Sequence, residues 1–198
     1  MGRGMEYALH MPAVASGAGA TANLGTSQTT RGRPMLTAEE REAFALRVMG
    51  EMRRWPGVEM RSHASALEAG AEDGVEFRLA GRQIGHMHGD CAVHLSLTKA
   101  LKHGVLSEQL AEPLPVAPSS AWVMFNPMSA TDVEHAIWLL RLNYVRLRRQ
   151  RLTPLASASS ELLQQHEAAL GSVSSSVASL LQKTQLRSKP RPMRGLEA

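Results

Sequence analysis

The feature that most constrains the fold is a pair of extended runs joined by a short turn. Residues 75–79 alternate apolar and polar side chains with a period of two, which is typical of a strand with one buried face. Ala80-Gly81 follows as a turn, and a second extended run continues to His88. The sequence therefore predicts a β-hairpin over residues 75–88. A lone hairpin is marginally stable, so further strands and a covering layer are required.

Both requirements are met by the flanking sequence. Residues 93–97 and 121–125 have the composition of strands, and helix-start patterns followed by apolar residues at helical spacing predict helices at about 37–55 and 129–150. We therefore expect an α+β fold, in which these two helices pack a small, mainly antiparallel sheet that contains the hairpin at 75–88.

The domain boundaries follow from where large apolar side chains occur. Seven of the eight Phe, Trp and Tyr residues lie between residues 37 and 151, so we expect the folded domain at 36–152. Residues 1–35 are rich in Gly, Ala, Ser and Thr, which predicts a disordered leader. Residues 153–198 form a Ser-rich tail, in which heptad-like apolar spacing indicates a helix at 160–184 that could pair with a partner or a second copy of the chain. Its glycine and serine run favour a frayed tail instead.

Charge and cysteine content exclude several classes of function. Residues 36–152 contain 14 Lys/Arg and 14 Asp/Glu, so the excess positive charge lies at the two ends and we expect no nucleic-acid partner. The sequence has no apolar run of membrane-spanning length, and we expect no membrane partner. One cysteine, Cys91, cannot form an internal disulfide or a multi-cysteine zinc site, and we expect it to be structural. The expected localisation is cytoplasmic.

The densest group of reactive side chains lies at the end of the hairpin and in the strand after it. His86, His88 and His94 are the candidate site residues, because imidazole can transfer protons near neutral pH or polarise a substrate. Side chains two residues apart in a strand point to one side. With a two-residue turn, Phe77 lies opposite Ile84 and both histidines of the His-x-His run face the apolar core. A loop longer by one residue reverses that orientation.

Three interpretations of these histidines stay open. The first is a metal site, in which His94 or Asp90 completes the pair His86 and His88. The second is an acid/base or substrate-polarising role without a metal. The third is a set of histidines that hydrogen-bond to backbone carbonyls and only close the sheet. We predict catalytic roles for His86, His88 and His94, with neither a metal nor another cofactor.

Four segments resemble the luciferase domain family, which takes its name from fungal luciferases. They are Gly-Arg-Gln-Ile-Gly-His-Met-His-Gly at 81–89, His-Leu-Ser-Leu at 94–97, Ala-Trp-Val-Met-Phe at 121–125 and the acidic-to-apolar helix at 132–144. The resemblance covers about residues 56–150. It implies an α+β domain and, in the fungal enzymes, oxygenation of a hydroxypyrone luciferin by dioxygen without a recognised metal or organic cofactor. The resemblance also implies that His86, His88 and His94 are residues of the functional site.

The expected function is therefore binding of a small, aromatic ligand, with oxygenase-like chemistry implied by the resemblance. The alternative is a non-enzymatic interaction module that uses the helix at 160–184, including as a homo-oligomer. The two hypotheses differ in where the imidazoles lie, since an enzyme or binder needs them to converge on an accessible site.

Overall fold

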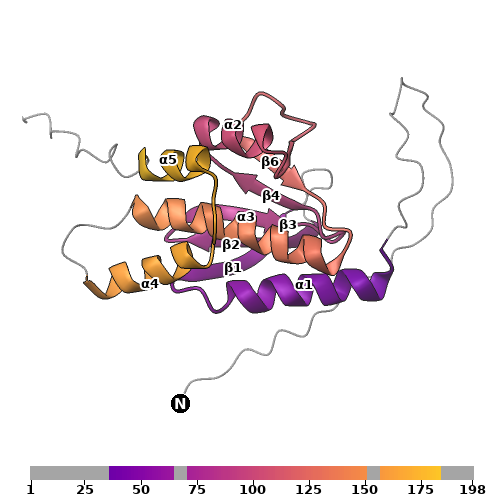
Figure 1. The fold of residues 1–198 in the computed structure, drawn as a ribbon. Helices are drawn as coiled ribbons and strands as arrows, with labels where there is room; N and C mark the ends of the chain where they lie inside the picture. Colours follow the sequence, from indigo (N-terminus) through magenta and orange to yellow (C-terminus); the bar gives the residue numbers. More distant parts are fainter. Residues whose placement is uncertain (1–35, 65–70, 151–156, 184–198) are drawn as a thin grey trace, which may run out of the picture. The chain divides into compact units, whose positions relative to one another are not determined.

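The computed structural model describes residues 36–64, 71–150 and 157–183 (Figure 1), so the predicted leader at 1–35 lies outside the described residues. Six strands form one sheet in the order β1-β2-β3-β4-β6-β5, and each neighbouring pair is antiparallel. The strands are β1 (Val58–Ala64), β2 (Glu72–Leu79), β3 (Arg82–Met87), β4 (Val93–Ser96), β5 (Glu112–Pro113) and β6 (Trp122–Phe125). The predicted α+β class and the hairpin are confirmed.

The helices begin at residues that satisfy their first backbone N–H groups. Thr37 and Glu40 form a complete capping box at the start of α1 (Ala38–Met52), as the sequence pattern predicts. Ser129 caps α3 (Ala130–Arg149) by accepting a hydrogen bond from the backbone N–H of Asp132. The other helices are α2 (Lys99–Ser107), α4 (Ser157–Ala168) and α5 (Ser175–Lys183). Within the described ranges no helix has the length and apolar content needed to cross a bilayer.

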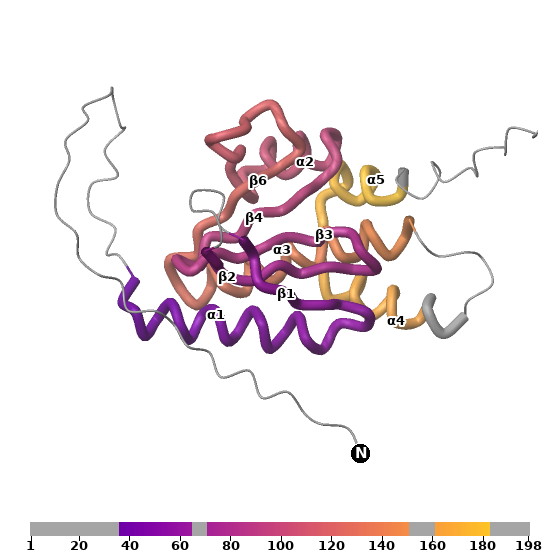
Figure 2. Tube along the Cα trace, turned by 180° about the vertical axis from the view of Figure 1, so that it is seen from behind, coloured from indigo at the N-terminus to yellow at the C-terminus, as the bar shows by residue number. Residues whose placement is uncertain are grey.

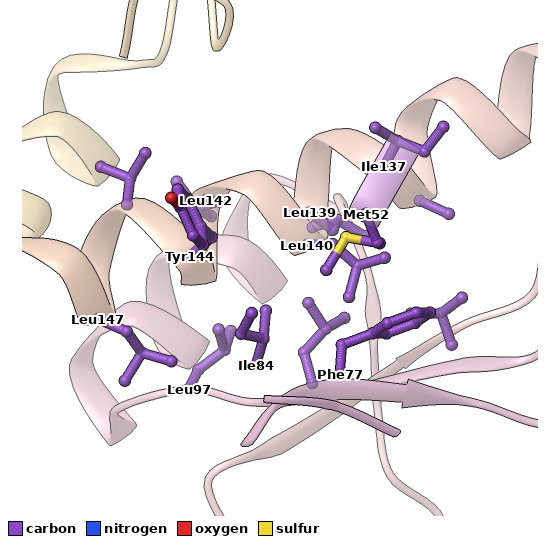
Figure 3. Close-up of a cluster of buried hydrophobic side chains, with 14 of the residues drawn as sticks. Met52, Phe77, Ile84, Leu97, Ile137, Leu139, Leu140, Leu142, Tyr144 and Leu147 are labelled. Carbon is purple, nitrogen blue, oxygen red and sulfur yellow. The ribbon is translucent and has the colours of Figure 1, made fainter. Parts of the chain in front are cut away.

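One face of the sheet carries the hydrophobic core. Helix α3 packs against β3 and β4, and α1 packs against α3. Figure 3 shows Ile137, Leu140 and Tyr144 of α3 in the same apolar cluster as Phe77 and Ile84 of the hairpin, and all five are at most 3% exposed. Seen from behind in Figure 2, β1 to β4 lie in front of α3, and α1 runs below them. In the described part of the chain, the opposite face of these strands is therefore free of helices.

The hairpin has the predicted two-residue turn but not the predicted register. Phe77 pairs with Gly85 rather than with Ile84, because Ile84 is an extra residue that bulges out of β3. Gly85 then faces α3, and His86 lies on the other face of the sheet. Our prediction that His86 and His88 face the apolar core beside Phe77 is wrong, since one extra residue exchanges the two faces.

A buried polar side chain on α3 contacts this bulge. Asn143 is fully buried and donates hydrogen bonds through Nδ2 to the carbonyl oxygens of Ile84 and Ser96. Its Oδ1 accepts a hydrogen bond of 2.6 Å from Nε of Arg146, which is also buried. Buried carbonyl oxygens need hydrogen-bond donors. Asn143 provides one for the bulge of β3, at Ile84, and one for the end of β4, at Ser96.

The predicted tail helix is formed as two helices, α4 and α5, with Gly171 between them at a φ of 64°. Such a positive φ ends a helix at low cost when the residue is glycine. Helix α4 packs against α3, and α5 packs against α2. The apolar stripe is buried within the chain itself, at Leu163, Leu170, Val177 and Leu181.

Candidate functional site

Four histidines gather on the helix-free face of the sheet. His86 in β3 and His94 in β4 are direct partners across the two strands. His88 follows the end of β3, and His63 lies near the end of β1 at an irregularity in its pairing with β2. His86 is 7% exposed, whereas the other three are partly exposed, so part of the group reaches solvent.

The three predicted site residues meet at one point. Nε2 of His86 lies 3.1 Å from Nε2 of His88 and 3.1 Å from Nδ1 of His94. Nε2 of His88 also lies 3.1 Å from Nδ1 of His94. The three nitrogens therefore form an equilateral triangle, which we call the histidine triangle (His86, His88 and His94).

Two polar side chains hold the outer edges of the triangle. Nδ1 of His88 lies 2.6 Å from Oδ2 of Asp73, whose Oδ1 accepts a 3.3 Å hydrogen bond from the backbone N–H of Gly89. Nδ1 of His86 lies 2.7 Å from Nε2 of Gln83. Contacts of this kind fix the rotation of an imidazole and decide which of its nitrogens faces inward.

His63 and Asp73 are site residues that sequence reasoning missed. The ring of His63 stacks on that of His86, with centroids 3.8 Å apart and planes 13° from parallel. The sequence contained a sign of the position of His63: Glu59, Arg61 and His63 occupy alternate positions of β1, so their side chains share a face. Asp73 lies outside the predicted hairpin at 75–88, because β2 begins earlier, at Glu72.

Trp122, the first residue of β6, borders the histidines. Its ring centroid is 5.3 Å from that of His86. Phe125 and Trp138 instead pack against His135, at 4.7 and 5.6 Å. Trp122 thus adds a flat apolar surface beside the histidine triangle.

Asp90 and Cys91, the other reactive side chains of this segment, have structural contacts. Oδ1 of Asp90 accepts the backbone N–H of Ala92 and so stabilises the turn before β4. The buried Cys91 thiol donates to the carbonyl oxygen of Arg41, and burial raises the pKa of that thiol. A protonated, buried thiol is a poor nucleophile, in agreement with a structural role.

The imidazoles of His86 and His94 are neutral near pH 7. Burial, followed by the positive charge that His63 would carry, lowers the pKa of His86 to about 3. Burial, followed by the charge of His88, lowers the pKa of His94 to about 4. Both rings therefore keep an unprotonated nitrogen, as a metal ligand or a hydrogen-bond acceptor requires. A general base works best with a pKa near the operating pH, so neither ring is tuned for that role.

Two sets of these residues have ligand atoms close enough for a metal. The ring nitrogens of His63, His86 and His88 lie within 4.8 Å of one another. The histidine triangle is tighter, with all three separations at 3.1 Å.

Comparison with models of protein families matches residues 81–143 to the luciferase domain. The matched segment contains the whole histidine triangle and Trp122. No curated protein and no solved structure matches the chain.

Proposed function

Because residues 81–143 match the luciferase domain, we propose that this chain binds a small molecule at its histidine triangle and acts on it in an oxygenase-like reaction. One observation carries the proposal: three imidazole nitrogens converge on the helix-free face of the sheet, beside Trp122. Side chains that only close a sheet have no physical reason to converge in this way.

The surroundings of the triangle indicate the chemical class of the ligand. Arg61 and Arg78, which share this face, form ion pairs with Glu59 at 2.9 Å and Glu76 at 3.2 Å. Their charge is therefore compensated, which disfavours a strongly anionic ligand such as a phosphate. The Trp122 ring offers a surface for stacking. A planar, hydroxylated and weakly acidic molecule fits these features best.

The imidazoles orient such a ligand for reaction with dioxygen. Unprotonated ring nitrogens of the triangle accept hydrogen bonds from an enolic hydroxyl, which increases the electron density on the neighbouring carbon. That carbon forms a bond to dioxygen, the dioxygen takes up two electrons, and the enolic proton ends on the new peroxide. The ligand is oxidised by two electrons, and no further reductant is needed.

A ligand screen tests the proposal. Hydroxypyrones and related hydroxylated aromatic compounds are added to the full-length chain, and the melting temperature is recorded, because a ligand that binds the native state raises it. Consumption of dioxygen is then measured for each compound that binds. We expect a hydroxypyrone to raise the melting temperature of the wild type and of His103→Asn, a matched control at an exposed position of α2, but not of His94→Asn. A shift that His94→Asn keeps in full would contradict this assignment.

The alternative role as an interaction module has less support. Pairing through residues 160–184 requires an accessible apolar stripe, and Leu163, Leu170, Val177 and Leu181 are buried within the chain. No second function is therefore proposed.

A further inference from the structure

We propose that Nε2 of His86, Nε2 of His88 and Nδ1 of His94 together bind one divalent first-row transition-metal ion. This departs from the absence of a metal that the sequence led us to expect. The proposal rests on the proposed function only for the role of the ion, since binding itself follows from the geometry of the histidine triangle.

The size of the triangle suits such an ion. A point equidistant from three nitrogens that are 3.1 Å apart lies about 1.8 Å from each within their plane. Histidine binds zinc at about 2.0–2.1 Å, so an ion about 1 Å above the plane reaches all three nitrogens at its normal bond length. In a regular tetrahedral site, two such nitrogens are about 3.3 Å apart. The observed separations therefore need to change by only a few tenths of an ångström.

Hydrogen bonding alone cannot account for the triangle. Each ring nitrogen either carries a proton and donates or has a lone pair and accepts. Among three nitrogens that are mutual neighbours, at least two must be of the same kind, so at least one of the three contacts sets lone pair against lone pair or N–H against N–H. A metal ion bound by three lone pairs removes this conflict, because every nitrogen then has the same favourable partner.

The outer contacts are those that metal-binding histidines use. When Nδ1–H of a neutral His88 ring is donated to Asp73, the lone pair of that ring is on Nε2, which is directed into the triangle. The amide of Gln83 contacts Nδ1 of His86, and a half-turn of the amide presents its oxygen as an acceptor for an Nδ1–H. Asp73 also places a negative charge beside the site, which offsets part of the charge of a divalent ion.

The third ligand of the ion is His94 and not His63. We assign His63 as a positioning residue, which acts through its contact with His86. Its ring lies nearly parallel to the His86 ring, so the two make contact through their faces. The set that includes His63 spans up to 4.8 Å, which requires larger movements than the histidine triangle does. Three histidine ligands also leave a coordination position, as in catalytic zinc sites. When the ion is bound, the enolic oxygen of the proposed ligand would occupy that position, in place of the hydrogen bond to a ring nitrogen.

Metal binding is measured on the full-length chain after removal of bound metal with a chelator. Zn²⁺ and Co²⁺ are the probes, with stoichiometry from elemental analysis and affinity from competition with a coloured chelator. We expect one ion for each chain, and a visible Co²⁺ spectrum of the tetrahedral, nitrogen-ligated type. Absence of stoichiometric Zn²⁺ and Co²⁺ binding by the folded wild type would overturn the proposal, without any variant being needed.

Variants then identify the ligands. His94→Asn should weaken Co²⁺ binding by more than about 100-fold, and Asp73→Asn by about 10- to 100-fold, as for other partners of metal-bound histidines. His63→Asn should keep one ion with an affinity within about 10-fold of the wild type, and His103→Asn should have no effect. Loss of the ion in His63→Asn but not in His94→Asn would assign the other set of histidines and refute the proposal.

Failure of this proposal and failure of the proposed function give different results. If the chain binds a hydroxypyrone but no Zn²⁺ or Co²⁺, the small-molecule function stands and the metal site is wrong. If it binds one Co²⁺ through His94 but no hydroxypyrone changes the Co²⁺ spectrum or the melting temperature, the metal site stands and the proposed ligand is wrong.

Discussion

Replacing Asn143 by alanine tests whether its buried contacts hold the bulge that places the histidines. Its Nδ2 donates to two buried carbonyls, those of Ile84 and Ser96, and its Oδ1 accepts from Arg146 at 2.6 Å. Two neutral hydrogen bonds at about 1 kcal/mol each and one to a charged group at about 1.5–3 kcal/mol are lost. The Ser96 carbonyl keeps a bond from Arg146, so its share of about 1 kcal/mol is left out and we expect the free energy of unfolding to fall by about 2.5–4 kcal/mol in total.

The assay is urea unfolding of the full-length chain at neutral pH, followed by tryptophan fluorescence. Asn126→Ala changes an exposed asparagine after β6 and should stay within about 0.5 kcal/mol of the wild type. A loss below about 1 kcal/mol in Asn143→Ala would refute the reasoning, because it would mean that the three hydrogen bonds of Asn143 do not stabilise the folded state by the amounts given above. We also expect the folded variant to bind Co²⁺ more weakly, since the bulge determines where His86 lies.

Three further predictions concern the histidines, the sheet and the tail. Without metal, the chain should lose about 1.6 kcal/mol of stability through His86 alone between about pH 6.5 and 5, because its folded pKa is about 3 and the unfolded chain takes up the proton first. Urea unfolding at the two pH values checks this, and an equal loss in His86→Asn would contradict it. Gly85→Ala should lower stability by at least about 2 kcal/mol, because its Cβ would lie 2.6 Å from the carbonyl oxygen of His94, whereas Gly50→Ala in α1 has open space and should raise stability by about 0.5–1 kcal/mol. The reverse order of melting temperatures for the two glycine variants would show that Gly85 is not packed as described. Val177→Asp should lower the melting temperature by several degrees, since this fully buried side chain holds α5 against α2; an unchanged melting temperature would mean that α5 does not pack there.

The fold class was predictable because it depends on local patterns. Alternation at 75–79, the capping box at Thr37 and the apolar stripe of α3 each reflect a few neighbouring residues, and the structure contains all three. The register of the hairpin was not predictable in the same way. It depends on a bulge at Ile84 whose carbonyl is hydrogen-bonded by Asn143, and these residues lie 59 positions apart in the chain.

The site was predictable only in part for the same reason. His86, His88 and His94 lie within nine residues of one another, and the sequence singled them out together. His63 and Asp73 reach the triangle from β1 and β2, so their roles depend on which strands pair and on which faces meet. The tail shows a similar limit, because heptad-like spacing cannot distinguish pairing with a second chain from packing against the chain's own α2 and α3.

X-ray absorption at the zinc edge, on the full-length chain loaded with one equivalent of Zn²⁺, tests the central claim most directly. We expect about three imidazole nitrogens at about 2.0–2.1 Å from the ion, and fewer imidazoles in His94→Asn. An ion surrounded by oxygen ligands alone, or a nitrogen shell that His94→Asn leaves unchanged, would contradict the claim that the histidine triangle is a metal centre.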